Sequence, residues 1–477
     1  MSTAIATEQI RHIATTSLQA LAAAAAPHQG LVPNVLDLAG QALSERPPAI
    51  TGQRQGDRAV RGCNLLHDIP LLEAWSAAAQ AWDLPELAAA GEAYLDTWMA
   101  QCTDTPSGLW PWGEHAFWDL ITQAPGNSYE QAGRGGGLTH DHLRQAPPWF
   151  WDRCWQRSPQ RVRAFCHGLD NHFKDTPELE FLRHAAIGHK GRNAMDRTAR
   201  SCDFPRHTGL YLVDLACVLA REDDAALLAQ LHLWLDYWWQ RQEPSGLLRI
   251  ESRTPSANDS QYEMLTVNQT ASLAASLLEA ANVLDARHPA VATTMRERAA
   301  HYLDAVYTAP HDRAGGSYIF DLRRDDPSIV RYYGTWGSRY GRPVGANMAL
   351  HLLAAHRAGA DKRALEDATV LMRPCCTEPL PQESEIMAKD PGLVVQCLLE
   401  LYLRTDDQTW LGAAQARAGE AIAAYWQPGQ PLPRGATGGH HYEGQLMPSI
   451  LIHALTRLAL VLEGHSDDLL PMDATQR

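Results

Sequence analysis

Long apolar runs are missing from this sequence of 477 residues. No stretch approaches the roughly 20 consecutive apolar residues that a transmembrane helix needs, which excludes a membrane-spanning protein. An excess of positive charge is missing too, since 41 Lys and Arg stand against 55 Asp and Glu, a formal net charge of −14. Nucleic acids and anionic membrane surfaces attract basic proteins, so neither is an expected partner.

Cysteine lacks any useful pattern here. The nine cysteines show no metal-like spacing, and only Cys375 and Cys376 are adjacent. This argues against a cysteine-based metal site and indicates small buried side chains in a reducing compartment.

Phenylalanine is scarce, at seven residues, whereas tryptophan reaches fifteen. The broad face and polar N–H of Trp suit the apolar faces of sugar rings, but Trp also fills wedges between helices, so both interpretations stand.

The N-terminal segment lacks the basic region of a secretory signal peptide. An alanine-rich run at Leu21–Ala26 is preceded by Glu8, Arg11 and His12. We therefore expect an N-terminal helix and a cytoplasmic protein.

Alternating β-branched runs are few, and apolar residues recur at helical spacing through most of the chain. Several segments share one form: an apolar helix, a short polar turn, and a second helix that ends in aromatic residues. Strong copies occupy Ala74–Met99, Leu212–Trp239, Ala271–Tyr307 and Val394–Trp426, with weaker ones at His142–Phe173 and Ala346–Met372. The helix at Gln445–Glu463 is expected to pair with the N-terminal helix.

Such hairpins cannot bury both faces alone, so they stack into a solenoid or close into a ring. Three inserts, at Leu109–Gly137, Gly188–Pro205 and Gly315–Gly345, are too long for solenoid turns and favour the ring. We predict an all-α fold: one (α/α)-barrel domain of six or seven hairpins over residues 1–477. Long rim loops, with a short β-ribbon near residues 315–320, would line a central cleft, and residues 464–477 would form a polar tail.

The densest group of titratable residues lies in the first two inserts and between them. It contains Gly113–His115, His140–His142 and Arg183–His184. Two imidazoles and a carboxylate from three separate segments can form a site for a divalent transition metal that leaves positions open for substrate oxygen. Because the chain has 21 histidines, rim histidines without a metal are the alternative interpretation.

A basic insert follows this group. Residues 189–206 hold six cations or near-cations in a net-acidic protein, among them Lys190, Arg192 and Arg197. Arginine grips carboxylates in a two-pronged manner, so these three residues are candidates for binding an acidic substrate. Trp110 and Trp112 are candidates for stacking on its sugar rings. A solvated loop is the alternative for the insert.

The order Gly-Glu-His, His-Asp, Arg-His resembles the active-site pattern of family 2 polysaccharide lyases, over roughly Leu109 to Gly191. These are (α/α)-barrel pectate lyases that use a transition metal, typically manganese. The resemblance implies that His115, Asp141 and His184 hold the metal. It also implies that Arg183 is the Brønsted base. The activity implied is metal-assisted β-elimination on a (1,4)-linked galacturonan or a related acidic oligosaccharide.

Two departures bear on this assignment. Asp141 stands where the family has Glu, one methylene longer, so the ligand role could pass to Glu114 or Glu130. The separation of 26 residues between His115 and Asp141 is longer than in the family and needs a small insertion. A guanidinium is essentially always protonated, so Arg183 has a second interpretation, as a binder of carboxylate.

Other functions fit the same ring. Epimerases of the N-acylglucosamine 2-epimerase type and unsaturated glucuronyl hydrolases use His or Asp as general acid and base without a metal. The segment His440–Glu443 would suit that chemistry. A carbohydrate-binding ring without catalysis and a helical interaction scaffold complete the alternatives, because the fold alone decides none of them.

Overall fold

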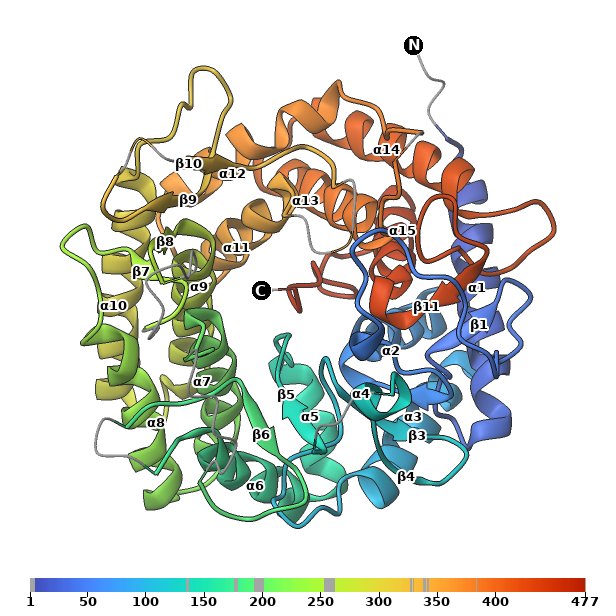
Figure 1. Cartoon of the computed structure of the whole chain (residues 1–477). Coiled ribbons are helices and arrows are strands. Elements are labelled where there is room, and N and C mark those ends of the chain that lie inside the picture. Colours follow the sequence, from blue (N-terminus) through green and yellow to red (C-terminus); the bar gives the residue numbers. More distant parts are fainter. Residues whose placement is uncertain are drawn as a thin grey trace.

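The structure is a computed structural model, and it describes residues 5–133, 137–175, 179–192, 201–252, 262–326, 328, 330–337, 340, 343–382 and 384–476. Figure 1 shows its helices arranged as a ring with two concentric layers. Within the described residues, seven helical hairpins make up these layers. The predicted ring of paired helices is therefore confirmed, and of the six or seven hairpins expected, seven are present in the described residues. No helix in this part of the chain combines the length and apolar character needed to cross a membrane.

Most helices of the inner layer are buried on almost every side; the exception is α5 (Pro148–Arg157), in which Asp152 and Gln156 are exposed. Every residue of α7 except Arg206 is buried, for example, as expected for a helix that is apolar all round. The inner helices are α2 (Leu65–Trp82), α5 (Pro148–Arg157), α7 (Pro205–Leu219), α9 (Val267–Leu284), α11 (Gly345–Arg357), α13 (Lys389–Thr405) and α15 (Pro448–Leu462). Glycine brings two of them into close contact: a Cβ on Gly392 of α13 would lie 2.8 Å from the backbone nitrogen of Leu451 in α15.

The outer layer buries one face of each helix and exposes the other. The outer helices are α1 (Thr7–Ala25), α3 (Pro85–Thr97), α6 (Pro159–Gly168), α8 (Ala225–Trp239), α10 (Pro289–Thr308), α12 (Lys362–Met372) and α14 (Gln408–Tyr425). The expected partnership of the first helix with the last is present, because α1 packs against α15.

Aspartate in the turns explains where the outer helices begin. The side chains of Asp224, Asp361 and Asp407 each accept a hydrogen bond from a backbone N–H in the first turn of α8, α12 and α14. Such N-caps satisfy donors that the helix itself leaves unpaired. The turn after α2 uses Asp83 in the left-handed conformation, with a φ of 54°.

Short antiparallel sheets lie in the connections that precede the inner helices (Figure 1). One sheet pairs β1 (Val35–Asp37) with β11 (His441–Glu443), and another pairs β5 (Thr139–Asp141) with β6 (His184–Ala186). A third joins β2 (Gly62–Cys63), β3 (Ala116–Asp119) and β4 (Ala124–Asn127), next to the short helix α4 (Ser128–Gln131). The fourth has the order β10 (Val330–Tyr332), β9 (Ile319–Arg323), β8 (Met264–Thr266), β7 (Leu248–Arg249).

The expected ribbon near residue 315 is thus part of a larger set of strands. Sequence periodicity could not reveal the others, because strands of two to five residues are too short to show an alternating pattern.

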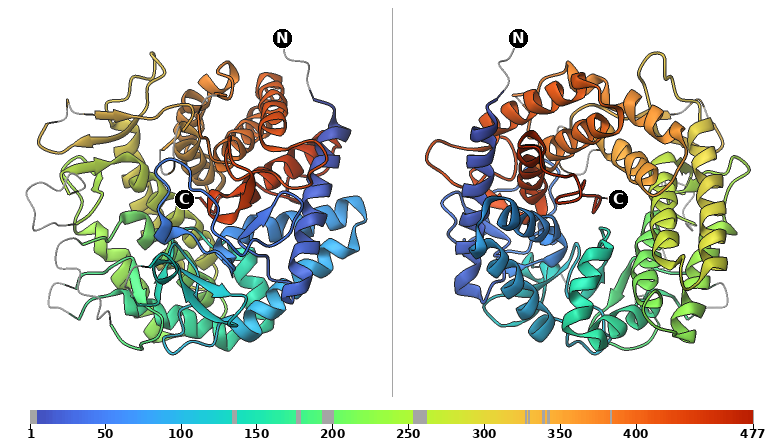
Figure 2. Two further views of the ribbon diagram at one scale, coloured as in Figure 1. Left: turned by 45° about the vertical axis from the view of Figure 1, so that its right-hand side comes forward. Right: turned by 180° about the vertical axis from the view of Figure 1, so that it is seen from behind.

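The C-terminal segment after α15 turns into the middle of the ring (Figures 1 and 2). Although its composition predicts a polar tail, Leu470 and Met472 are buried in it. Two hydrogen bonds hold it to inner elements: the Gln145 N–H donates to the Thr475 carbonyl at 2.9 Å, and the Asp473 N–H donates to Gln396 Oε1 at 2.7 Å. The segment therefore forms part of the interior of the ring.

Candidate metal centre

Cross-strand pairing brings together two of the predicted ligands. In the β5–β6 sheet, Asp141 lies directly opposite His184, although 43 residues separate them in the chain. Directly opposite residues on antiparallel strands have neighbouring side chains. The third segment, Gly113–His115, runs alongside Asp141 and completes the site.

Gly113 allows this close approach. Its φ is +115°, and a Cβ at this position would lie 1.8 Å from the Asp141 carbonyl oxygen. No other residue type fits such a contact. The Asn64 side chain donates a hydrogen bond to the Gly113 carbonyl at 2.6 Å and so holds the turn from the other side. The glycine of the Gly-Glu-His pattern is therefore a structural requirement of the site.

Four potential ligands converge there: Glu114, His115, Asp141 and His184. One ligand atom from each lies within 4.8 Å of the others. Glu114 Oε2 is 3.3 Å from His115 Nε2, and His184 Nε2 is 3.4 Å from Asp141 Oδ2. His115 and Asp141 are completely buried, and Glu114 retains 12% of its side-chain exposure.

The donor set fits a divalent transition metal. Imidazole nitrogens and carboxylate oxygens are suitable ligands for Mn²⁺ and for Zn²⁺. His115 Nε2 and Asp141 Oδ1 are buried and make no hydrogen bond to any described residue, although an unsatisfied buried polar atom costs about 1–3 kcal/mol. A cation held by these atoms would remove that cost.

The histidines are in the form that binds metals. Burial is the main cause that lowers the pKa of His115, and burial together with the Arg183 charge lowers the pKa of His184 to about 4. Both rings are therefore neutral near pH 7, as ligation requires. His115 Nδ1 is 3.1 Å from the Gly56 carbonyl, which can only accept, so this nitrogen carries the proton and Nε2 offers its lone pair to the cluster.

Arg183 joins the two carboxylates. Its Nη1 donates to Asp141 Oδ2 at 2.7 Å and its Nη2 donates to Glu114 Oε2 at 2.6 Å. Burial opposes ionisation of all three groups, but Arg183 and neighbouring histidines outweigh it and hold the pKa of Glu114 and of Asp141 below their ordinary values. In turn the carboxylates raise the pKa of Arg183. In this arrangement Arg183 is a cation.

Two further residues border the cluster that sequence reasoning did not select. His207, in the first turn of α7, is fully buried, and its Nε2 is 3.6 Å from Asp141 Oδ1. Asp57, from the loop before β2, has Oδ1 at 3.8 Å from His115 Nδ1. Burial and the Glu114 charge raise the pKa of Asp57 to about 8. In the sequence, only the adjacent Arg206 and His207 at the end of the basic insert could have indicated His207 as a site residue, and nothing indicated Asp57.

The predicted sugar-stacking role of Trp110 and Trp112 does not fit the structure. Both rings are fully buried, and both pack against Phe150, Trp151 and Phe165. The sequence correctly indicated a cluster of aromatic residues, but the cluster is buried in the core and is not exposed in the cleft. These rings form the core beneath the site.

Trp112 instead supports the site through a relay of histidines. Its Nε1 donates to His140 Nε2 at 2.7 Å, His140 Nδ1 is 2.9 Å from His172 Nε2, and His172 Nδ1 is 2.8 Å from the Leu182 carbonyl. An indole can only donate and a carbonyl can only accept, so both rings are neutral and each passes one hydrogen bond forward. The relay fixes β5 relative to the residue that precedes Arg183.

The remaining predicted residues are scattered. Lys190 is exposed, and Arg192 forms an ion pair with Asp170 at 3.1 Å. Arg197 lies outside the described residues. Glu130, the other candidate ligand, is exposed and does not belong to the metal-binding group.

The segment His440–Glu443, proposed for metal-free chemistry, has a structural role in the fold. Glu443 accepts two hydrogen bonds from Arg58 and lies 2.9 Å from His441 Nε2. This buried ion pair ties the loop before β2 to β11. His440 itself is exposed.

Comparison with family models finds no match, and comparison with curated proteins finds none. The chain is similar to several solved structures. An unsaturated glucuronyl hydrolase specific for heparin is 12% identical, covering 96% of this chain and 99% of its own, with a TM-score of 0.47. A family 76 glycoside hydrolase (mannosidase) from Bacteroides thetaiotaomicron is 11% identical over 96% and 100%, with a TM-score of 0.45. Cellobiose 2-epimerase from Bacillus thermoamylovorans is 9% identical over 90% and 92%, with a TM-score of 0.44. Similarity at this level carries no information about chemistry.

Proposed function

We propose that this protein is a carbohydrate-active enzyme that cleaves a uronate-containing oligosaccharide by metal-assisted β-elimination. The observation that carries the proposal is the buried group of Glu114, His115, Asp141 and His184, with the Arg183 guanidinium between its two carboxylates. Its residues come from three separate segments, as the ligands of a catalytic metal commonly do. The resemblance of those segments to family 2 polysaccharide lyases supports the same reaction.

β-Elimination removes the proton on C5 of a 4-linked uronate, forms the C4–C5 double bond and expels the oxygen on C4, which takes up a proton from water. A divalent metal held by His115, Asp141 and His184 would neutralise the C6 carboxylate and stabilise the enolate-like charge of the transition state. The chain itself orients these ligands, through the Gly56 carbonyl behind His115 and the cross-strand pairing of Asp141 with His184.

Arg183 is the candidate catalytic residue, with two roles to distinguish. Its two ion pairs favour the protonated guanidinium, which can hold a substrate carboxylate or the charge that develops on it. To act as the base it must lose a proton, which requires that the carboxylates be engaged by other cations. Replacing Arg183 by Lys separates the roles. If Arg183 acts only through its charge, Arg183→Lys leaves the shape of the pH–rate profile unchanged. If Arg183 is the base, the lysine has a lower pKa, and the acidic limb of the profile moves to lower pH.

The direct test is the ultraviolet absorbance of the unsaturated uronide product. Polygalacturonate and short oligogalacturonates would be incubated with protein dialysed against a chelator, with and without added Mn²⁺. We expect absorbance to rise only with the metal. No rise on any uronan, together with no metal bound after dialysis, would overturn both the reaction and the site.

A second candidate is a metal-free hydrolase or epimerase of acidic or neutral sugars. The specific observation is the pair Asp57 and Glu114, whose pKa values are displaced in opposite directions, so that one carboxyl is protonated and the other ionised near pH 7. A general acid and a general base need such a pair. In this case Asp57→Asn abolishes activity and a chelator has no effect. If His440→Ala abolishes activity while His184→Ala is tolerated, a metal-free mechanism at β11 is correct instead.

A further inference from the structure

Arg144, in the connection between β5 and α5, is a buried cation that forms no ion pair with any residue that the structure describes. Only 7% of the residue is exposed, and neither Nε nor Nη1 has a hydrogen-bond partner in the described part of the chain. The other deeply buried arginines differ in this respect. Arg58 is paired with Glu443, and Arg457 is paired with Glu400 and Asp467. An uncompensated buried charge is strongly destabilising, so its presence calls for an anion that comes from outside the chain.

Two more cations share the neighbourhood of Arg144. Arg206 lies in the first turn of α7, and its buried Nε also makes no hydrogen bond to the described residues. Lys389 is the first residue of α13, keeps 11% of its side-chain exposure and has its carboxylate neighbour Asp390 at 3.7 Å. Burial is the main cause that lowers the pKa of all three cations. The charge of Arg206 lowers that of Arg144 further, to about 10, although Asp473 and Glu114 act in the opposite direction. Arg144 and Arg206 also lower the pKa of Lys389.

The fold explains why these three side chains converge. Arg206 and Lys389 stand at the N-terminal ends of inner helices, and Arg144 lies shortly before a third. Helix N-termini carry partial positive charge and free N–H groups, which favour anions. His207, the neighbour of Arg206, contacts Asp141, and the Arg183 charge lowers the pKa of Arg206. Arg206 therefore adjoins the candidate metal centre, and Arg144 and Lys389 lie within electrostatic reach of Arg206.

We propose that Arg144, Arg206 and Lys389 form a second carboxylate-binding site that takes the uronate next to the one at the metal centre. The identity of the sugar rests on the proposed function, whereas the need for an anion rests on the unpaired Arg144. Arginine and lysine together supply a planar fork and a point charge, which suit a carboxylate on a flexible sugar chain. The enzyme would thus require two adjacent uronates, a minimum substrate of two acidic sugar units.

The first test measures stability without any uronate. Sodium sulfate stabilises folded proteins in general, so Arg144→Met supplies the baseline. Compared with sodium chloride at equal ionic strength, sulfate should raise the melting temperature of the wild type more than that of Arg144→Met, because only the wild type binds it at this site. Without ligand, Arg144→Met should be at least as stable as the wild type, because an unpaired buried charge has been removed. A structural arginine behaves in the opposite way. The matched control is Arg58→Met, which leaves Glu443 buried without its partner and should lower the melting temperature sharply.

The second test uses turnover. On trigalacturonate, Arg144→Met and Lys389→Met should each raise KM about 10- to 100-fold, with a smaller change in kcat. If trigalacturonate is cleaved and both variants keep the wild-type KM, the second site is wrong and the proposed function stands. If no uronate is cleaved but the wild type gains more from sulfate than Arg144→Met does, the anion site stands and the proposed function is wrong. A melting temperature of Arg144→Met far below that of the wild type would overturn the inference, since it would show that Arg144 is structural.

Discussion

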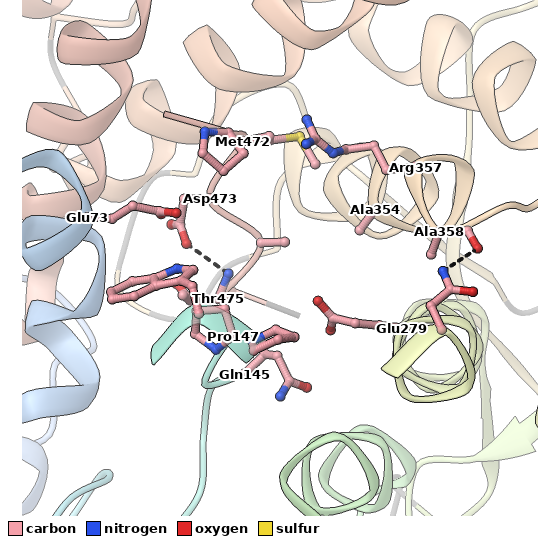
Figure 3. Close-up of a pocket in the computed structure, with 15 residues that line it drawn as sticks. Glu73, Gln145, Pro147, Glu279, Ala354, Arg357, Ala358, Met472, Asp473 and Thr475 are labelled. Atoms are coloured by element: carbon pink, nitrogen blue, oxygen red, sulfur yellow. Dashed lines mark hydrogen bonds between the residues drawn. The ribbon is translucent and has the colours of Figure 1, made fainter. Parts of the chain in front are cut away.

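The interior of the ring has two differently built regions. The region at the N-terminal ends of the inner helices holds imidazoles, the ion-paired Arg183 and the unpaired Arg144. The other region is a cavity of about 290 Å³. It is lined by the C-terminal ends of α9 and α11, the start of α5 and the C-terminal segment, and its charged residues are Glu73, Glu279, Asp473 and Arg357. Figure 3 shows Glu73, Glu279 and Asp473 around it, with Asp473 hydrogen-bonded to the backbone of Thr475.

The difference between them concerns which buried groups each region leaves without a hydrogen-bond partner. In the second region, among the described residues, these are oxygen atoms: Asp473 Oδ2, Gln145 Oε1 and Thr475 Oγ1. The first concentrates cations and lone pairs without protein partners, at a cost in stability that a metal and an acidic ligand would remove. At the second, the chain supplies its own closure, because the C-terminal segment enters the ring and its buried residues pack there. We therefore assign the chemistry to the first region and stability to the second. Four changes test this assignment.

The largest effect is expected from His184→Ala. Loss of a ligand should remove the metal and lower kcat/KM about 10³-fold or more, because the charge on the substrate carboxylate is no longer neutralised. Metal analysis and product absorbance measure both. Glu279→Gln, in the other region, is the control and should retain metal and activity. An equal loss in Glu279→Gln would show that the chemistry is not confined to one region.

Glu400→Gln should destabilise the fold by about 3–5 kcal/mol, since buried Arg457 loses a partner. Burial opposes ionisation, but Arg457, Arg357 and Arg404 lower the pKa of Glu400 to about 2. The pKa of Glu400 is near 4.3 in the unfolded chain, so its ionised carboxylate stabilises the fold at pH values above 4.3. This stabilisation is lost as the pH falls from about 4.3 toward 2. Urea unfolding should therefore show the variant's deficit at pH 7 and a smaller one at pH 3. A deficit independent of pH would refute the electrostatic explanation.

Leu470→Ala tests the role of the C-terminal segment. Leu470 is 1% exposed, so truncation should cost about 2–4 kcal/mol of unfolding free energy, measured by denaturant titration. Activity at a temperature where both proteins are folded should be unchanged. A large loss of activity without loss of stability would mean that the segment serves the reaction.

The smallest effect is expected from Glu73→Gln. Burial raises the pKa of Glu73 to about 8. As pH rises from about 4.5 to 8, the unfolded chain releases this proton while the folded chain keeps it, so the wild type loses stability that the variant retains. Unfolding at pH 5 and at pH 6 should show the variant gaining about 1 kcal/mol relative to the wild type. If the stability difference between variant and wild type is the same at both pH values, solvent or a cation stabilises the ionised Glu73 carboxylate in the folded protein.

The parts of the site that could be predicted from sequence are those within recognisable short segments. Gly113–His115 and Arg183–His184 stand out because several chemically useful residues are adjacent, and the structure brings His115, Asp141 and His184 together. Arg144 and Lys389 could not be selected, because each is a single cation whose neighbours in space are far away in the chain. Trp110 and Trp112 were misplaced because an aromatic side chain looks the same in a core as on a binding surface.

The sequence by itself determined the hairpins, since helical periodicity and turn residues such as Asp224 and Asp407 act over a few residues. It also indicated the residue types of the metal centre. Only the tertiary structure decided which of the 21 histidines meet, which arginines are left unpaired, and that a tail of polar composition enters the ring. The reason is that local preferences say nothing about contacts made when distant hairpins close into one ring. Burial and pairing, which give these side chains their chemistry, arise only at that closure.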